Sequence, residues 1–403
     1  MKIKKKILAM LMVFTILTGV LPISSMAVTT TQDDITFSEE KQLSPEDIVD
    51  DVIESVNDYI KNNDENKLWM IADLISYGEI LNKKSLADTL IKDFENLEYV
   101  SASVLAKYII AISGLGYDAS QIKLSDEKIL NLPKLLLDEI EKGNGTDIYT
   151  LPYVIIALQQ DKKYATEEQL TTIKEMLISK QDEWMDTQWG VDGITPVVLA
   201  LSKYYEQEDI KIILDEALAK MITVQKENGA VYAGEYDTYG ASSTGLAIVA
   251  VASIGIDPNT IKSSKGLSLV DGLIRYYDEE TGKIKETNNS FATEQGLRGL
   301  ISAIKFSSNN QTYRIYDFAD VEKQLWAEKV TGDNNDDNDD NDENTNKDDN
   351  NNDNDENINK DDTNGADRTP NTGDKNMFMQ WSLLFMILSF GVIVIGVKKK
   401  SQN

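Results

Sequence analysis

A short apolar phrase built around a small residue recurs six times in this chain, and it limits the possible folds more than any other feature. The small residues at its centre are Ala72, Ala111, Ala157, Ala200, Ala250 and Gly299. Successive members are separated by 39, 46, 43, 50 and 49 residues, which leaves room for a second helix between each pair. The repeat therefore predicts an all-α fold, in which six helical hairpins form a closed ring within one domain at 44–328.

The two helices of each predicted hairpin differ in pattern. After Ser44 and Pro45, the apolar residues Ile48, Val52 and Val56 fall on one face, so this helix is amphipathic and belongs on the outside. The repeated phrases are apolar on nearly every face, which predicts buried inner helices. The other outer helices are predicted to begin at Ser85, Ser125, Thr166, Asp209 and near Lys265.

The composition excludes several kinds of chemistry. The 403 residues include neither histidine nor cysteine, which excludes triads with a histidine base, cysteine thioesters, disulfides and thiolate or imidazole zinc sites. We therefore expect no metal and no cofactor. The net charge of −28 makes nucleic acid a poor partner, because phosphate binding needs clustered Lys and Arg. The Asp/Asn-rich segment at 329–368 lacks the apolar residues of a core and is predicted to be a disordered stalk.

The N-terminal end carries an export signal. Lysines are concentrated at Lys2–Lys6, an apolar run follows, and Ser25 and Ala27 provide the small residues of a cleavage site. These features predict a signal peptide at 1–27, followed by a linker at 28–43. An uncleaved membrane anchor is the alternative.

The C-terminal end carries an anchoring signal. The uncharged stretch at 377–397 is long enough for a transmembrane helix, and a basic cytoplasmic tail follows it at 398–403. Together with that span and tail, a short upstream motif resembles the sortase sorting signal of Gram-positive cell-wall proteins. The motif consists of Thr369, Pro370, Thr372 and Gly373, with Thr369 where the family has Leu.

The resemblance to a sorting signal implies cleavage after Thr372 and transfer to peptidoglycan. Sortase and peptidoglycan are then the expected partners, and the C-terminal helix holds the chain in the membrane before processing. The alternative is a plain C-terminal membrane anchor. With either anchor, the predicted location is the cell surface of a Gram-positive bacterium.

The hairpin layout also carries a family resemblance. Phrases such as Ser242–Ala247 and Ala292–Leu297 resemble the α/α-toroid superfamily, which includes squalene-hopene cyclases, protein prenyltransferase β subunits and the cobalamin carrier intrinsic factor. Residues 225–231 are similar to the Gln-x3-Gly-x-Trp repeat of the cyclases, with Val231 in place of Trp. The resemblance implies an α/α-toroid fold for this domain. The acid motif of the cyclases is missing from the predicted domain, and the zinc ligands of the prenyltransferases are missing as well.

A candidate ligand site follows from the expected hairpin order. The N-terminal ends of all inner helices would emerge on one rim, and the segments before them combine acids with Tyr and Trp, whose flat faces suit sugars and peptides. The candidates are Trp184, Asp186, Trp189, Asp192, Tyr232, Glu235, Tyr236, Asp237, Tyr239 and Glu294. The wider rim includes Trp69 and Tyr149. The alternative is that the aromatic residues fill the mouth of the ring and the acids cap helices.

Three functions are compatible with these features. The missing catalytic residues favour a non-catalytic, wall-anchored module for ligand binding or adhesion, which holds a glycan, a peptide or a small ligand. An extracellular carbohydrate-active enzyme is the alternative, and it requires a carboxylate pair about 5 to 9.5 Å apart on the rim. A carrier for a small hydrophobic or cobalamin-like ligand is a minor alternative.

Overall fold

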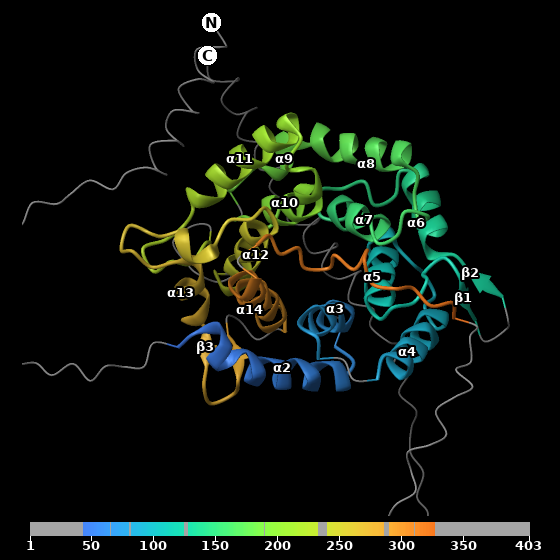
Figure 1. Ribbon diagram of the computed structural model, residues 1–403, viewed down its shortest axis with the longest axis horizontal. Coiled ribbons are helices and arrows are strands. Elements are labelled where there is room, and N and C mark those ends of the chain that lie inside the picture. The colour runs from blue at the N-terminus through green and yellow to red at the C-terminus, as the bar shows by residue number, and fades with distance from the viewer. Residues whose placement is uncertain are drawn as a thin grey trace, which may run out of the picture. The chain divides into compact units, whose positions relative to one another are not determined.

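The structure is a computed structural model that describes residues 43–64, 66–79, 82–124, 128–188, 190–232, 240–285, 290–309 and 311–326. The chain divides into two compact units at Glu328, and all of these residues belong to the first. This unit is mostly helical, which confirms the all-α class (Figure 1). The signal peptide, the stalk, the sorting motif, the C-terminal span and the basic tail lie outside the described residues, as does the linker except for its last residue.

Six helices that carry the repeated phrase pack side by side in the interior. They are α3 (Lys67–Tyr77), α5 (Ala102–Gly114), α7 (Leu151–Leu158), α10 (Ile194–Leu201), α12 (Gly240–Ser253) and α14 (Phe291–Asn309). Each contacts the next in chain order, and α14 contacts both α12 and α3, so the series returns to its first member (Figure 1). All six small residues of the phrase are buried.

The pair α12 and α14 shows why some of these positions must be small. A Cβ on Gly245 would lie 2.3 Å from the carbonyl oxygen of Gln295, and one on Gly299 would lie 2.7 Å from the Cα of Gly245. The two helix backbones therefore touch, and a methyl group at either glycine would force them apart.

The second set of helices covers the first. It consists of α2 (Pro45–Lys61), α4 (Lys83–Glu95), α6 (Leu132–Glu141), α8 (Glu167–Ser179), α11 (Glu208–Ile222) and α13 (Leu269–Ile274). Figure 1 shows these helices outside the inner series, and α2 illustrates their one-sided burial, because Ile48, Val52 and Val56 are buried on one face. The remaining elements are the short helices α9 (Gln181–Trp184), η1 (Ser202–Tyr204) and η2 (Pro258–Thr260), and two antiparallel hairpins: β1 (Ile122–Lys123) with β2 (Ile129–Leu130), and β3 (Tyr277–Asp278) with β4 (Lys283–Ile284).

Local capping explains which predicted helix starts were right. Thr166 caps α8 at the predicted start, and the Gln169 side chain accepts a hydrogen bond from the Thr166 backbone N–H. The prediction at Ser125 was wrong by several residues, because a β-hairpin occupies this region. Asn131 caps α6 instead, and Pro133 in the first turn is preorganised for a helix.

Two other starts also differ from the prediction. The helix α4 begins at Lys83, before the predicted Ser85, because Asn82 accepts a hydrogen bond from the Ser85 N–H and acts as the cap. The helix α13 begins at Leu269, later than the prediction near Lys265, because Ser268 and Asp271 form a capping box.

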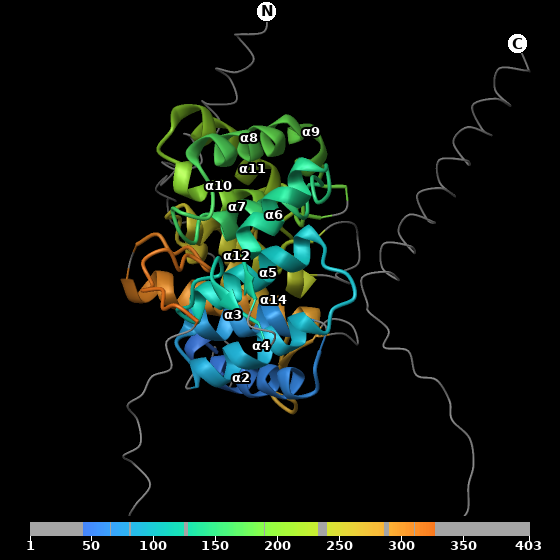
Figure 2. The same ribbon diagram turned by 90° about the vertical axis from the view of Figure 1, so that its right-hand side faces the viewer.

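Residues 311–326, which we call the closing segment, cross the C-terminal ends of the inner helices. The Tyr313 N–H donates to the Ala252 carbonyl of α12, and the Tyr313 hydroxyl donates to the Ser76 carbonyl of α3. Arg314 binds both oxygens of Ser202, directly after α10. In Figure 1 the segment is orange and passes in front of the inner helices, and Figure 2 shows it along one side of the helix layer.

The rest of the closing segment binds the ends of two more inner helices. The Gln160 side chain, after α7, donates to the Tyr316 carbonyl and accepts from the Phe318 N–H. Gln324 exchanges backbone hydrogen bonds with Gly116 and Asp118, which follow α5. The segment therefore closes one side of the inner helix layer. None of the helices in the described part of the chain is both long and apolar enough to cross a bilayer.

Candidate functional site

The side of the inner layer opposite the closing segment holds the N-terminal ends of the inner helices, and we call it the N-terminal rim. The two highly exposed tyrosines among the described residues both precede inner helices: Tyr99 is 70% exposed before α5, and Tyr149 is 57% exposed before α7. Since the closing segment covers the other side, the described residues of this rim are the candidates for a ligand site.

Asp192 is a rim acid whose carboxylate bonds to another inner helix. It precedes α10 but does not cap it, because its carboxylate accepts a hydrogen bond from the Ser243 hydroxyl of α12, at 3.0 Å. The side chain is accessible to water, yet enough protein surrounds it for desolvation to raise its pKa above the usual value.

Other rim acids have local structural roles. Asp147 accepts hydrogen bonds from the backbone N–H groups of Tyr149 and Thr150 and so closes the turn that leads into α7. Asp186 accepts from the Gln188 N–H in the same way. These contacts are ordinary turn chemistry, whereas the described hydrogen bond of Asp192 is to a side chain of another inner helix.

Aromatic rings lead from Tyr153 of α7 into the interior. Desolvation raises the pKa of Tyr149, and the negative charge of Asp192 adds to this rise. Desolvation also raises the pKa of Tyr153, where Arg298 opposes the rise and Asp73 and then Asp192 add to it. The Tyr153 ring packs on Trp69 of α3 with 4.6 Å between ring centroids. Trp69 in turn stacks on Tyr316 of the closing segment, at 5.4 Å. The rings of Tyr153, Trp69 and Tyr316 thus form a continuous series from α7 to the closing segment.

A charged cluster lies at the end of this path. The Arg298 Nε donates to Asp73 Oδ1 at 3.1 Å, and the Tyr316 hydroxyl donates to the same oxygen at 2.6 Å. Arg298 also forms an ion pair with Glu294, four residues earlier on α14. Its guanidinium lies over the rings of Trp69 and Tyr316, at 5.3 and 5.2 Å. The cluster is buried, so it holds the interior together and offers no accessible group to a ligand.

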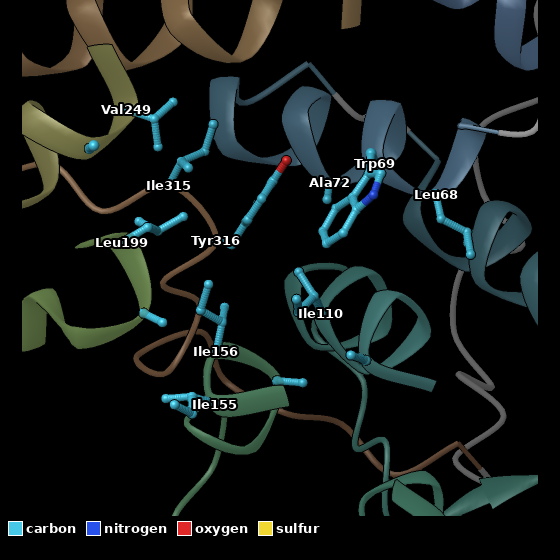
Figure 3. Close-up of a cluster of buried hydrophobic side chains, with 14 of the residues drawn as sticks. Leu68, Trp69, Ala72, Ile110, Ile155, Ile156, Leu199, Val249, Ile315 and Tyr316 are labelled. Atoms are coloured by element: carbon cyan, nitrogen blue, oxygen red, sulfur yellow. The ribbon is translucent and has the colours of Figure 1, made fainter. Parts of the chain in front are cut away.

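Figure 3 shows the apolar surroundings of this cluster. Tyr316 and Ile315 of the closing segment point among side chains from the inner helices, including Trp69, Ile110 and Ile156. Burial raises the pKa of Asp73 from 3.8 to about 6, against the opposing effects of Arg298 and Tyr316. The residues that fill this centre thus come from both ends of the domain.

The structure places the predicted site residues in different environments. Trp184 is fully buried and donates its indole N–H to the Leu177 carbonyl, so we leave it out of the site, as we do the buried Glu294. Asp186 is exposed, and Tyr232 is partly buried with Lys226 above its ring. The candidates outside the described residues are Trp189, Glu235, Tyr236, Asp237 and Tyr239.

Sequence reasoning missed Tyr153, Asp73 and Arg298. A signal for the last two was present, since each is a charged residue within an otherwise apolar inner-helix phrase, where an unpaired charge would be costly. Tyr153 is one tyrosine among many and carried no such signal.

Two further features of the described residues bear on ligands. A shallow hollow on α4 is lined by Asn82, Lys84, Ser85, Asp88, Thr89 and Lys92. Of its charged residues, Lys84 and Asp88 already pair at 2.7 Å. In the part of the chain that the structure describes, no three acidic side chains gather as a metal-binding group.

Comparisons with known proteins give no match. A scan against protein-family models finds none, and neither does a search of curated proteins or of solved structures. We therefore infer function from the residues and their geometry.

Proposed function

We propose that this protein is a cell-surface ligand-binding module built on a six-hairpin α/α toroid and attached to the wall through its C-terminal sorting signal. Its ligand binds at the N-terminal rim around Asp192, Tyr149 and Tyr153. The six buried small residues and the series of inner-helix contacts support the toroid. The targeting motifs of the sequence support the location.

One observation carries the proposal: the two sides of the inner helix layer differ. The closing segment covers the C-terminal side and binds the ends of α3, α5, α7, α10 and α12. On the opposite rim, Tyr149 is exposed, and the accessible carboxylate of Asp192 bonds to another inner helix without capping α10. The packing of the core requires neither an exposed tyrosine nor an accessible carboxylate. A tyrosine ring beside a desolvated acid is typical of a binding surface.

Binding measurements with the full-length protein test this proposal. A panel of wall and host glycans and of short peptides is titrated against the wild type, Tyr149→Ala and Asp192→Asn, with Asp209→Asn on the exposed start of α11 as a matched acid control. Binding that both rim substitutions weaken at least about tenfold, a loss of about 1.4 kcal/mol, supports the rim. Binding that neither substitution changes would show that the site lies elsewhere.

A second function is favoured by the desolvation that raises the pKa of Asp192, because the general acid of glycoside hydrolysis is a carboxyl whose pKa is shifted upward in this way. Release of reducing sugar from wall polysaccharides, lost in Asp192→Asn and kept in Asp209→Asn, would favour this enzyme. Binding without release would favour the non-catalytic module.

A further inference from the structure

We propose that the interior of the inner helix layer contains a latent binding site for a phenol, an aromatic ring that carries a hydroxyl group. Tyr316 of the closing segment occupies this site as an internal ligand. The site is formed by Trp69 and Asp73 of α3 and by Arg298 of α14. It is separate from the rim of the proposed function, and the inference does not depend on that rim.

The contacts of the Tyr316 side chain are the first argument. Its ring stacks on Trp69, with 5.4 Å between the centroids and 22° between the planes. The Arg298 guanidinium lies 5.2 Å from the Tyr316 ring centroid, and the Tyr316 hydroxyl donates to Asp73 Oδ1 at 2.6 Å. Figure 3 shows this ring among side chains of the inner helices. Stacking, a cation–π contact and a charge-assisted hydrogen bond thus engage both the ring and the hydroxyl of a phenol.

The backbone of Tyr316 is the second argument. Its φ of 68° lies in the left-handed region, which is strained for a bulky aromatic residue. Among the described residues other than glycine, Asn63 also has a positive φ, but asparagine tolerates this conformation. Strained residues persist only where their surroundings hold them, and they are concentrated at ligand clamps and switches. A free phenol would make the ring contacts without this strain, which favours displacement of the closing segment.

The free oxygen of Asp73 is the third argument. Arg298 Nε and the Tyr316 hydroxyl both donate to Oδ1, whereas the buried Oδ2 has no hydrogen-bond partner among the described residues. Loss of the hydroxyl donor would leave this buried carboxylate still less satisfied, at a cost in free energy. The site should therefore select a hydroxylated ring over a plain hydrocarbon ring of the same shape.

A variant with the internal ligand removed tests the site directly. Full-length Tyr316→Ala is titrated with p-cresol, which matches the tyrosine side chain, and with toluene, which differs only by the missing hydroxyl. A buried cavity made by such a truncation can bind a ring of matching size. We expect p-cresol to bind at least about tenfold more tightly than toluene. Equal binding of the two probes, or no binding of p-cresol, would overturn the site.

The wild-type protein tests whether Tyr316 can be displaced. The Phe318 N–H donates to the Gln160 side chain at 3.1 Å and so reports on the closing segment. Addition of p-cresol should accelerate amide hydrogen exchange at Phe318 by at least about threefold and leave exchange in the outer helix α8 unchanged. An equal effect of toluene would indicate general loosening of the domain and would overturn the proposal.

A second variant keeps the test decisive if Tyr316→Ala does not fold. Tyr316→Phe keeps the ring but loses the hydrogen bond to Asp73, so the internal ligand is weaker and p-cresol should accelerate exchange at Phe318 more than in the wild type. Tyr108→Phe, at a buried tyrosine of α5 that packs on Phe94, is the control and should respond like the wild type. Exchange that p-cresol leaves unchanged in both the wild type and Tyr316→Phe would overturn the proposal.

Discussion

The Tyr316 hydroxyl donates a 2.6 Å hydrogen bond to Asp73 Oδ1, and so joins the closing segment to the first inner helix across 243 positions of sequence. Arg298 of the last inner helix donates to the same oxygen. Three parts of the chain that are far apart in sequence therefore meet at one carboxylate. This contact fixes how the C-terminal part of the domain closes on its beginning.

Removal of the Tyr316 hydroxyl should destabilise the domain. In Tyr316→Phe the ring stays in place but the buried Asp73 loses a donor, so we expect the free energy of unfolding to fall by about 1 to 3 kcal/mol. Denaturant unfolding followed by circular dichroism measures the change. Tyr99→Phe, at a position 70% exposed, is the control and should change stability by less than about 0.5 kcal/mol. Equal stability of both variants would show that the Asp73 contact contributes nothing.

The buried Asp73 should also make stability depend on pH in a defined direction. Its pKa of about 6 in the folded state lies above the usual 3.8, so the folded state binds this proton more tightly than the unfolded state. The resulting stabilisation is fully present below about pH 4 and is lost as the pH rises through about 6. Between pH 7 and pH 4 the wild type should therefore gain up to about 3 kcal/mol relative to Asp73→Asn.

Unfolding curves of the wild type and Asp73→Asn at matched pH values measure this difference, since the other acids titrate alike in both proteins. A difference that stays constant from pH 7 to pH 4 would contradict the raised pKa. A difference of opposite sign would mean that Arg298 and Tyr316 outweigh burial.

The contact of α12 with α14 should not tolerate a methyl group. Gly299→Ala would raise helix propensity by about 1 kcal/mol, yet its Cβ would lie 2.7 Å from the Gly245 Cα. Because overpacking between two backbones outweighs propensity, we expect a net loss of about 1 to 3 kcal/mol in thermal or denaturant unfolding. Glu175→Ala on the exposed face of α8 is the control for propensity alone. A stabilised Gly299→Ala would show that the helices separate without cost.

The Gln160 side chain should control how firmly the closing segment is held. Gln160→Ala removes its hydrogen bonds to the Tyr316 carbonyl and the Phe318 N–H, so amide hydrogen exchange at Phe318 should accelerate by at least about tenfold. The neighbouring Gln159 bonds the Tyr204 hydroxyl and does not touch the closing segment, which makes Gln159→Ala a matched control. Unchanged exchange in Gln160→Ala would mean that other contacts suffice.

The targeting signals predict the ends of the mature protein. When the chain is expressed in a sortase-bearing Gram-positive host, mass spectrometry of the wall-released form should find an N-terminus at Val28 and a C-terminus at Thr372. Gly373→Ala should keep the protein in the membrane fraction. Recovery of an intact C-terminus at Asn403 from the wild type would favour the plain membrane anchor.

The sequence by itself determined the helical class and the positions of the inner helices, because a helix buried on all sides needs an apolar phrase with a small residue where a neighbour approaches, and all six predicted small residues are buried. It also predicted a rim of acids and aromatic residues before the inner helices, with Asp192 among them. Local patterns were less reliable at helix starts: Thr166 was right, but Ser125 was wrong because a β-hairpin there competes with the helix.

Only the tertiary structure decided what the polar residues do. Whether an acid closes a turn like Asp147, pairs in the core like Glu294 or remains accessible like Asp192 depends on neighbours that are distant in sequence. The closing segment is the clearest case, because its cross-chain contacts, such as that of Tyr316 with Asp73, follow no local periodicity. Sequence periodicity predicts which face of a helix is buried. It does not predict which distant residue a buried side chain contacts, because that depends on the three-dimensional packing of the whole domain.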